Sequence, residues 1–244
     1  MSKKQKNNER LIWTIITLIL LVALWYVTYL LISKSPDFLN SLGLGTTKTK
    51  EVKSAPAGSA LDELKKLPVK EAESGEDYER SEFSSGWASW GDCNVRQKIL
   101  NRDVKDKKLA ANGCTVVSGN LDDPYTGETI EMKTKAAVSR KVQIDHVVAL
   151  GNAWKTGGKH LSADKRKELA NDDLELIAVS SAANQEKSDM DASEWLPTYK
   201  PFQCQYVARQ IAVKIKYSLW VTSAEHNAMV GVLNTCPDQK LPAE

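Results

Sequence analysis

Hydrophobic residues in this chain fall into one long N-terminal run and a series of short segments separated by polar stretches. The long run, residues 11–32, contains no Asp, Glu, Lys or Arg. Its 22 residues are enough for one helix through a bilayer core of roughly 30 Å. Basic residues concentrate before it, which predicts a single-pass anchor with residues 1–10 in the cytoplasm and the C-terminal part outside the cell. The alternative is a cleaved signal peptide, which has a shorter apolar core and a small-residue cleavage site.

The remaining chain has the pattern of a linker followed by one domain. Residues 33–58 are rich in Ser, Thr, Lys, Gly and Pro, which predicts a flexible linker. Residues 59–237 suffice for one compact domain, and residues 238–244 form a tail. Helical and strand-like spacings are mixed within the domain, which predicts the α+β class. We expect helices at 60–67, 94–104, 162–170, 180–187, 205–218 and 222–233. We expect strands at 115–118, 128–132, 141–144 and 174–179, with a turn at 122–127.

The adjacent pair Asp145-His146 interrupts the apolar run 142–150. Buried ionisable groups must be paired or bound to a metal, so a chain that keeps such a pair is expected to use it. A structural ion pair with Arg140 or Lys141 is the simpler alternative. Because neighbouring strand residues point to opposite faces, the two side chains can serve one site only if the strand ends or twists there, or if the metal and the water lie between the two directions.

Polar residues downstream extend this pair into a possible catalytic set. Asn171 precedes an expected strand, and Asn184 and Lys187 lie three residues apart on one face of the helix that follows. A neutral imidazole can take a proton from water, which makes His146 the candidate general base. Asp145 and Asn184 offer the oxygen ligands that Mg²⁺ prefers. Asn171 is expected to bond the imidazole or orient the loop, and Lys187 to hold a backbone phosphate.

These residues resemble the motifs of the HNH nucleases with the ββα-metal fold. The similarity is greatest to secreted or anchored bacterial proteins that share the C-terminal domain of the GmrSD restriction enzyme. The segments that carry it are 93–104, 123–127, 143–150, 169–172, 184–189 and 194–197.

The resemblance spans roughly residues 60–236 and implies a ββα-metal core with added helices. It also implies metal-dependent hydrolysis of DNA, with RNA as a second substrate class, His146 as the base, and Asp145 and Asn184 on the metal. Mg²⁺ is the expected ion, with Mn²⁺ and Zn²⁺ as alternatives. Because 151–170 is an insertion, Asp173 is an alternative to Asn171 as the middle motif residue.

The cysteines and the charge limit the class of protein. Four cysteines without a Cys-x-x-Cys arrangement argue against a zinc ribbon and predict disulfides in an extracellular domain. Of the three possible connectivities, locality favours pairing Cys93 with Cys114 and Cys204 with Cys236. The formal net charge of +2 does not by itself indicate a nucleic-acid-binding protein.

Two functions from different classes follow. The first is a membrane-anchored extracellular endonuclease with a nucleic-acid substrate, most simply DNA; no protein partner is inferred. The second is a catalytically inactive module of the same fold that binds nucleic acid or the cell envelope. The enzyme is favoured because a binding module has no use for a general base. The basic stretch Arg209, Lys214 and Lys216 is interpreted as a solvated helix face.

Overall fold

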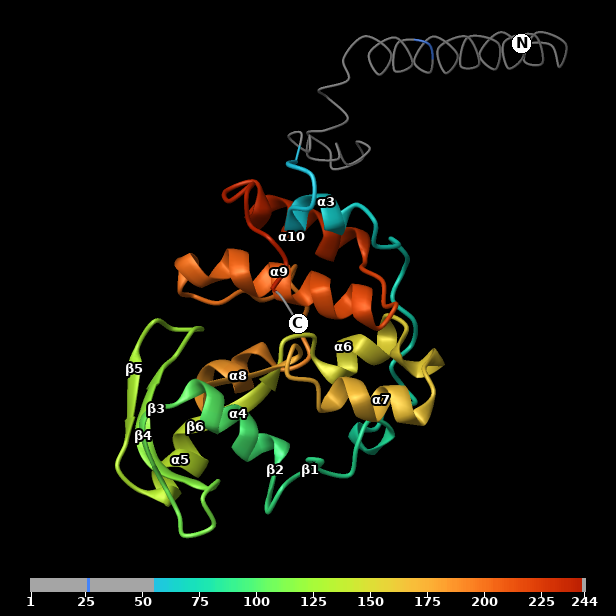
Figure 1. Cartoon of the computed structure of the whole chain (residues 1–244). Helices are drawn as coiled ribbons and strands as arrows, with labels where there is room; N and C mark the ends of the chain where they lie inside the picture. Colours follow the sequence, from blue (N-terminus) through green and yellow to red (C-terminus); the bar gives the residue numbers. More distant parts are fainter. Residues whose placement is uncertain (1–25, 27–54, 243–244) are drawn as a thin grey trace, which may run out of the picture. The chain divides into compact units, whose positions relative to one another are not determined.

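The computed structural model describes residue 26 and residues 55–242 (Figure 1). The chain divides into two units, Met1–Glu51 and Val52–Glu244, and the second contains the mixed α+β domain. Except for Tyr26, the predicted anchor at 11–32 lies outside the described residues, as does most of the predicted linker. Within the described part, no helix is both long and apolar enough to span a bilayer.

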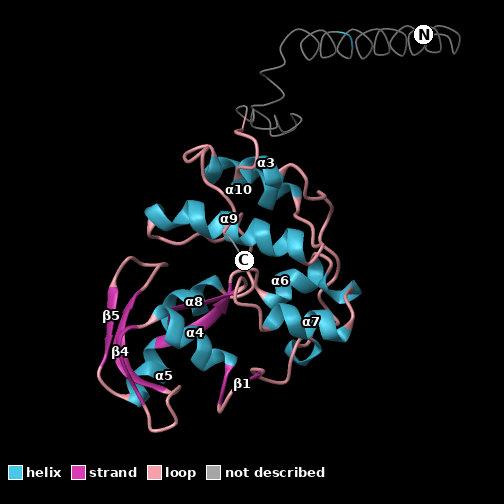
Figure 2. Ribbon diagram, in the orientation of Figure 1, coloured by secondary structure: helices cyan, strands magenta, loops and turns pink. Residues whose placement is uncertain are grey.

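The domain contains both short strands and helices (Figure 2). Its helices are α3 (Ala60–Leu64), η1 (Arg80–Glu82), α4 (Val95–Asp103), α5 (Lys135–Lys141), α6 (Leu150–Lys155), η2 (Gly158–His160), α7 (Ala163–Ala170), α8 (Ser181–Lys187), α9 (Lys200–Lys216) and α10 (Ser223–Leu233). Its strands are β1 (Ser89–Trp90), β2 (Cys93–Asn94), β3 (Lys105–Leu109), β4 (Val116–Asp122), β5 (Thr129–Met132), β6 (Val142–His146) and β7 (Leu176–Ser180). They form three antiparallel sheets with the orders β1-β2, β3-β4-β5 and β6-β7.

The β6–β7 ribbon is buried on both faces. On β7, Ile177 and Val179 belong to one hydrophobic cluster, which also contains residues of α3, α6, α9 and α10. The alternate residues Leu176 and Ala178 belong to a second cluster, formed with α4, β4 and α5. Since successive strand residues point to opposite faces, both sets must be apolar. This double burial accounts for the continuous apolar runs in the sequence.

The strand–strand–helix unit expected from the sequence is present. β6 pairs with β7 over five residues, from Val142 opposite Ser180 to His146 opposite Leu176. β7 then passes directly into α8 at Ser181. Asp145 and His146 are both regularly paired, with Ile177 and Leu176, and His146 is the last residue of the strand.

Helix starts follow the side-chain caps in the sequence. Asn94, Ser162 and Thr222 each accept a hydrogen bond from the backbone N–H three residues later, which fixes the starts of α4, α7 and α10. The expected turn at 122–127 is also present, with Gly127 at φ 77°. Strand β3 was not predicted because it has no hydrophobic pattern. All five of its residues are exposed, and four of them are charged.

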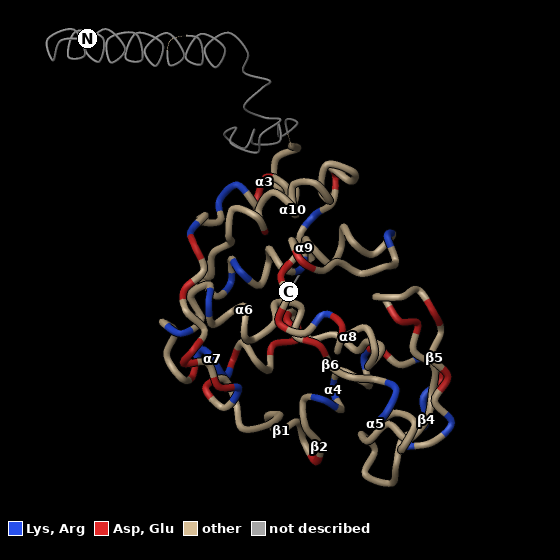
Figure 3. Tube along the Cα trace, turned by 180° about the vertical axis from the view of Figure 1, so that it is seen from behind, with Lys and Arg blue, Asp and Glu red and all other residues tan. Residues whose placement is uncertain are grey.

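The interpretation of α9 as carrying a solvated basic face is wrong. Lys214 is 1% exposed, and its Nζ donates to Glu225 Oε2 at 2.9 Å and to the Trp220 carbonyl. Arg209 donates to backbone carbonyls, including that of Leu174, and Lys216 forms an ion pair with Asp172. Over the whole domain, acidic and basic positions are interspersed (Figure 3).

Both predicted disulfides are confirmed. Cys93 is bonded to Cys114, and Cys204 is bonded to Cys236. The second bond ties α9 to the chain just after α10 and closes a loop with a sequence separation of 32. We expect replacement of Cys204 and Cys236 by Ser to lower the free energy of unfolding by about 3 kcal/mol, because the unfolded chain gains freedom. Urea unfolding of both proteins measures the difference, and equal midpoints and slopes would contradict it.

Candidate active site

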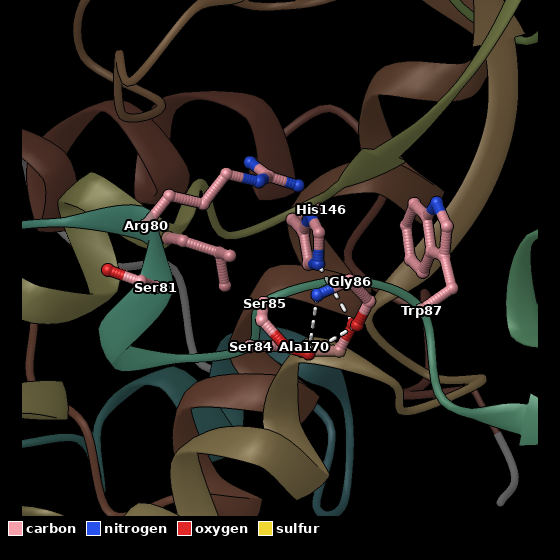
Figure 4. A pocket seen from close by; sticks show the side chains of 9 residues that line it. Arg80, Ser81, Ser84, Ser85, Gly86, Trp87, His146 and Ala170 are labelled. Carbon is pink, nitrogen blue, oxygen red and sulfur yellow. Dashed lines mark hydrogen bonds between the residues drawn. The ribbon is translucent and has the colours of Figure 1, made fainter.

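A pocket of about 540 Å³ opens at the end of β6 and brings together three of the predicted site residues. Asp145 and His146 line it from β6, and Asn184 lines it from α8. A second pocket of about 270 Å³ lies next to it and also contacts His146 (Figure 4). His146 therefore contributes to both pockets.

The His146 imidazole is held in one orientation and in its neutral form. Its Nε2 lies 3.0 Å from the Ala170 carbonyl oxygen, which can only accept, so Nε2 carries the hydrogen and Nδ1 keeps its lone pair. The ring stacks on Trp87, with centroids 5.7 Å apart and planes 5° apart. Burial lowers the pKa of His146 to about 3, and the nearby charges of Arg80 and Lys187 act in the same direction. The imidazole is therefore uncharged at neutral pH, and the Nδ1 lone pair is free to accept a hydrogen bond from water.

Asp145 lies on the opposite side of β6 from His146, among buried partners. Its Oδ1 accepts a hydrogen bond from Lys187 Nζ at 3.0 Å, and its Oδ2 accepts one from the Tyr125 hydroxyl. Burial raises the pKa of the Asp145 carboxyl, while Lys187 and Tyr125 favour its charged form. Asp145 therefore forms its ion pair with Lys187, and not with Arg140 or Lys141 as the simpler alternative predicts.

The predicted contact of Lys187 with a substrate phosphate is not supported by its position. The side chain is fully buried, and Lys187 is absent from the pocket wall. Besides Asp145, its Nζ donates to the His146 carbonyl at 2.8 Å. Lys187 therefore bonds to the Asp145 side chain and to the His146 backbone, and its role is to position these two residues.

Asn184 presents an amide to the same pocket. Its Nδ2 donates to Gln143 Oε1 at 2.8 Å, which turns its Oδ1 away from Gln143. Asp145 and Asn184 thus bring to the pocket one amide oxygen and one carboxylate, whose two oxygens already accept hydrogen bonds from Lys187 and Tyr125. Within residues 55–242 no group of three or more His, Cys, Asp or Glu is placed to hold a metal ion. The donor set fits an oxygen-seeking ion that keeps several waters, such as Mg²⁺, better than a zinc centre with three protein ligands.

Asn171 lies outside both pockets and orients a loop. Its Oδ1 accepts a hydrogen bond from Ala88 N at 2.8 Å, next to Trp87, and its Nδ2 donates to the Lys167 carbonyl. The imidazole bond comes from the carbonyl of the preceding residue, Ala170. The alternative residue, Asp173, is 46% exposed and paired with Lys98, away from His146.

Among the pocket residues that were not predicted are Arg80, Trp87, Arg96 and Gln143. Gln143 and Asp145 are two residues apart and lie on the same face of the strand. The two-residue repeat of a strand could therefore have predicted Gln143 as a site residue. The Arg96 guanidinium donates to the Val142 carbonyl at 3.1 Å, and burial lowers its pKa. No spacing in the sequence connects Arg80 or Trp87 with His146.

The α+β domain therefore carries a buried Asp-His pair beside a helix-borne Asn. The family model for the C-terminal domain of GmrSD restriction endonucleases matches residues 94–232. An "Uncharacterized secreted protein" from Arthroderma benhamiae is 36% identical over 182 residues, covering 74% of this chain and 86% of the relative. No solved structure matches the chain. The chain therefore belongs to the family of the GmrSD C-terminal domain, as the resemblance implied.

Proposed function

We propose that this protein is a metal-dependent endonuclease that hydrolyses phosphodiester bonds, with DNA as the first substrate class and RNA as the second. The observation that carries the proposal is the state of His146. It is neutral, its Nε2 is bonded to the Ala170 carbonyl, and it lines the same pocket as Asp145 and Asn184. A base with a free lone pair beside two oxygen ligands is the arrangement that activation of water requires.

In this mechanism each side chain has a separate task. Nδ1 of His146 takes the proton from the attacking water, while the Ala170 carbonyl keeps the ring in one tautomer and Trp87 fixes its plane. Asp145 and Asn184 would hold the divalent ion. When bound, that ion would stabilise negative charge on the phosphate and the leaving oxygen. Lys187 fixes the end of β6, so that the base and the metal ligands keep their relative positions.

The domain is proposed to act outside the cell, anchored by residues 11–32. Two disulfides suit an oxidising environment, and the relative from Arthroderma benhamiae is named as a secreted protein. Anchoring rests on the uninterrupted apolar run and its basic flank. Fractionation of cells that express the full chain tests this: the protein should sediment with membranes and be accessible to protease added from outside.

Digestion of plasmid DNA by the purified protein tests the activity. We expect nicking and linearisation in Mg²⁺, none in excess EDTA, and a rate at least about 10²-fold lower for His146→Gln, since general base catalysis contributes that much or more. Parallel assays with Mn²⁺ and Zn²⁺ identify the ion, and a single-stranded RNA assay tests the second substrate class. Equal digestion by wild type and His146→Gln, or digestion by neither with any of the three ions, would show that the proposal is wrong.

A further inference from the structure

The segment 80–88 forms a wall shared by the two pockets beside His146. Arg80 and Trp87 line both pockets, and the small residues between them line the smaller one (Figure 4). This segment precedes residues 94–232, which the family model covers. Its contribution to the site is therefore a feature of this chain's structure that the family match does not describe.

The segment is fixed to the domain at several points. Phe83 is 2% exposed and packs edge-on against Tyr78 and Trp154. Arg166 donates to the Glu82 carbonyl at 2.8 Å and to its carboxylate at 3.0 Å. At the far end, Asn171 accepts the hydrogen bond from Ala88 N. Arg80 and Trp87 are thus presented by an anchored segment, which reduces the entropy lost when a ligand binds.

Arg80 places a positive charge beside the proposed base. Its guanidinium extends toward the His146 ring (Figure 4), and its backbone lies in the short helix η1. Within residues 55–242 no acidic side chain forms an ion pair or hydrogen bond with this guanidinium. The other pocket arginine, Arg96, donates to the Val142 carbonyl. Arg80 is therefore exposed, charged and available to an anion at His146.

We propose that Arg80 binds the scissile phosphodiester in the larger pocket, which it lines together with His146, Asp145 and Asn184. This inference rests on the proposed function and names a further catalytic residue for it. A guanidinium matches two phosphate oxygens with two parallel hydrogen bonds, which a lysine ammonium does not reproduce. Charge that develops on the phosphate during attack would then be stabilised from the Arg80 side as well as from the metal side.

Kinetics of Arg80→Ala and Arg80→Lys test the proposal, with Arg140→Ala as the matched control. Arg140 is also an exposed arginine, but it lies on α5 and lines a different pocket. We expect Arg80→Ala to lower kcat/KM by about 10²-fold, with a loss in kcat, and Arg80→Lys to recover part of it. Arg140→Ala, which removes the same charge, should match wild type. If Arg80→Ala equals Arg140→Ala, the proposal is wrong while the endonuclease function stands.

Binding measured without catalysis separates this inference from the proposed function. In excess EDTA and in the His146→Gln background, fluorescence anisotropy reports the Kd of a short labelled DNA oligonucleotide. We expect Arg80→Ala to weaken binding by about tenfold relative to Arg140→Ala, as loss of a charge-assisted hydrogen bond predicts. If no divalent ion supports hydrolysis, the proposed function fails, but this difference in Kd still supports an Arg80–phosphate contact. Equal Kd values for the two variants overturn that contact.

Discussion

Replacing Lys187 by Met should lower the free energy of unfolding by about 3–5 kcal/mol. The Lys187 side chain is 0% exposed and its Nζ lies 3.0 Å from Asp145 Oδ1. Removing it leaves a carboxylate in a buried site without its counter-charge, and the His146 carbonyl also loses a donor. Breaking one partner of a buried pair is costly for this reason, even where the intact pair contributes little net stability.

Urea unfolding of wild type and Lys187→Met measures this difference. Lys214→Met is the matched control, since Lys214 forms a comparable buried pair with Glu225 at 2.9 Å in another part of the domain. Both variants should lose stability, but only Lys187→Met should also lose activity under conditions where it remains folded. Adding Asp145→Asn to Lys187→Met should restore part of the stability. No recovery in the double variant would mean that the unpaired Asp145 carboxylate is not the cause.

Acid should destabilise the wild-type protein more steeply than it does a His146→Gln variant. Burial lowers the pKa of His146 to about 3 in the folded protein, whereas an unfolded histidine titrates near its ordinary value of about 6.5. Between these values the unfolded chain takes up a proton that the folded protein does not. Stability from the neutral imidazole is therefore present above about pH 6.5 and lost as the pH falls toward about 3.

The magnitude follows from the size of the shift. One pKa unit corresponds to 1.36 kcal/mol, so wild type should lose about 3 kcal/mol more than His146→Gln between about pH 7 and about pH 4. Gln is the suitable replacement because its amide can still donate to the Ala170 carbonyl but does not titrate. Buried carboxyls with a raised pKa, such as Asp145, Glu175 and Glu225, act in the opposite direction. They are present in both proteins, so the difference isolates His146; parallel stability–pH curves would contradict the prediction.

Local patterns in the sequence predicted the unit that carries the base. The apolar run around Asp145-His146 and the strand-like segment after Asn171 became β6 and β7, and the next helix became α8. The helices α4, α7 and α10 begin within one residue of the positions expected from the sequence, since each start is fixed by a side chain that accepts a hydrogen bond from three residues ahead. These features depend on neighbours along the chain.

Roles that depend on distant partners were harder to predict. A lysine on a short helix is ordinarily solvent-exposed, and only the fold shows that Lys187 lies against Asp145, 42 residues earlier. Lys214 was misinterpreted for the same reason. Arg80 and Trp87 reach His146 because Phe83 is buried against Trp154, a contact that no spacing in the sequence indicates.

The double burial of the β6–β7 ribbon limits how far this protein can be shortened. A fragment that retained only β6, β7 and α8 would expose Ile177 and Val179 on one face and Leu176 and Ala178 on the other. The backbone hydrogen bonds between β6 and β7 would remain. The Asp145-His146 pair, however, would lose the buried environment that keeps the imidazole neutral and the carboxylate paired. The smallest working unit is therefore the whole domain, with both layers of helices and strands that enclose the ribbon.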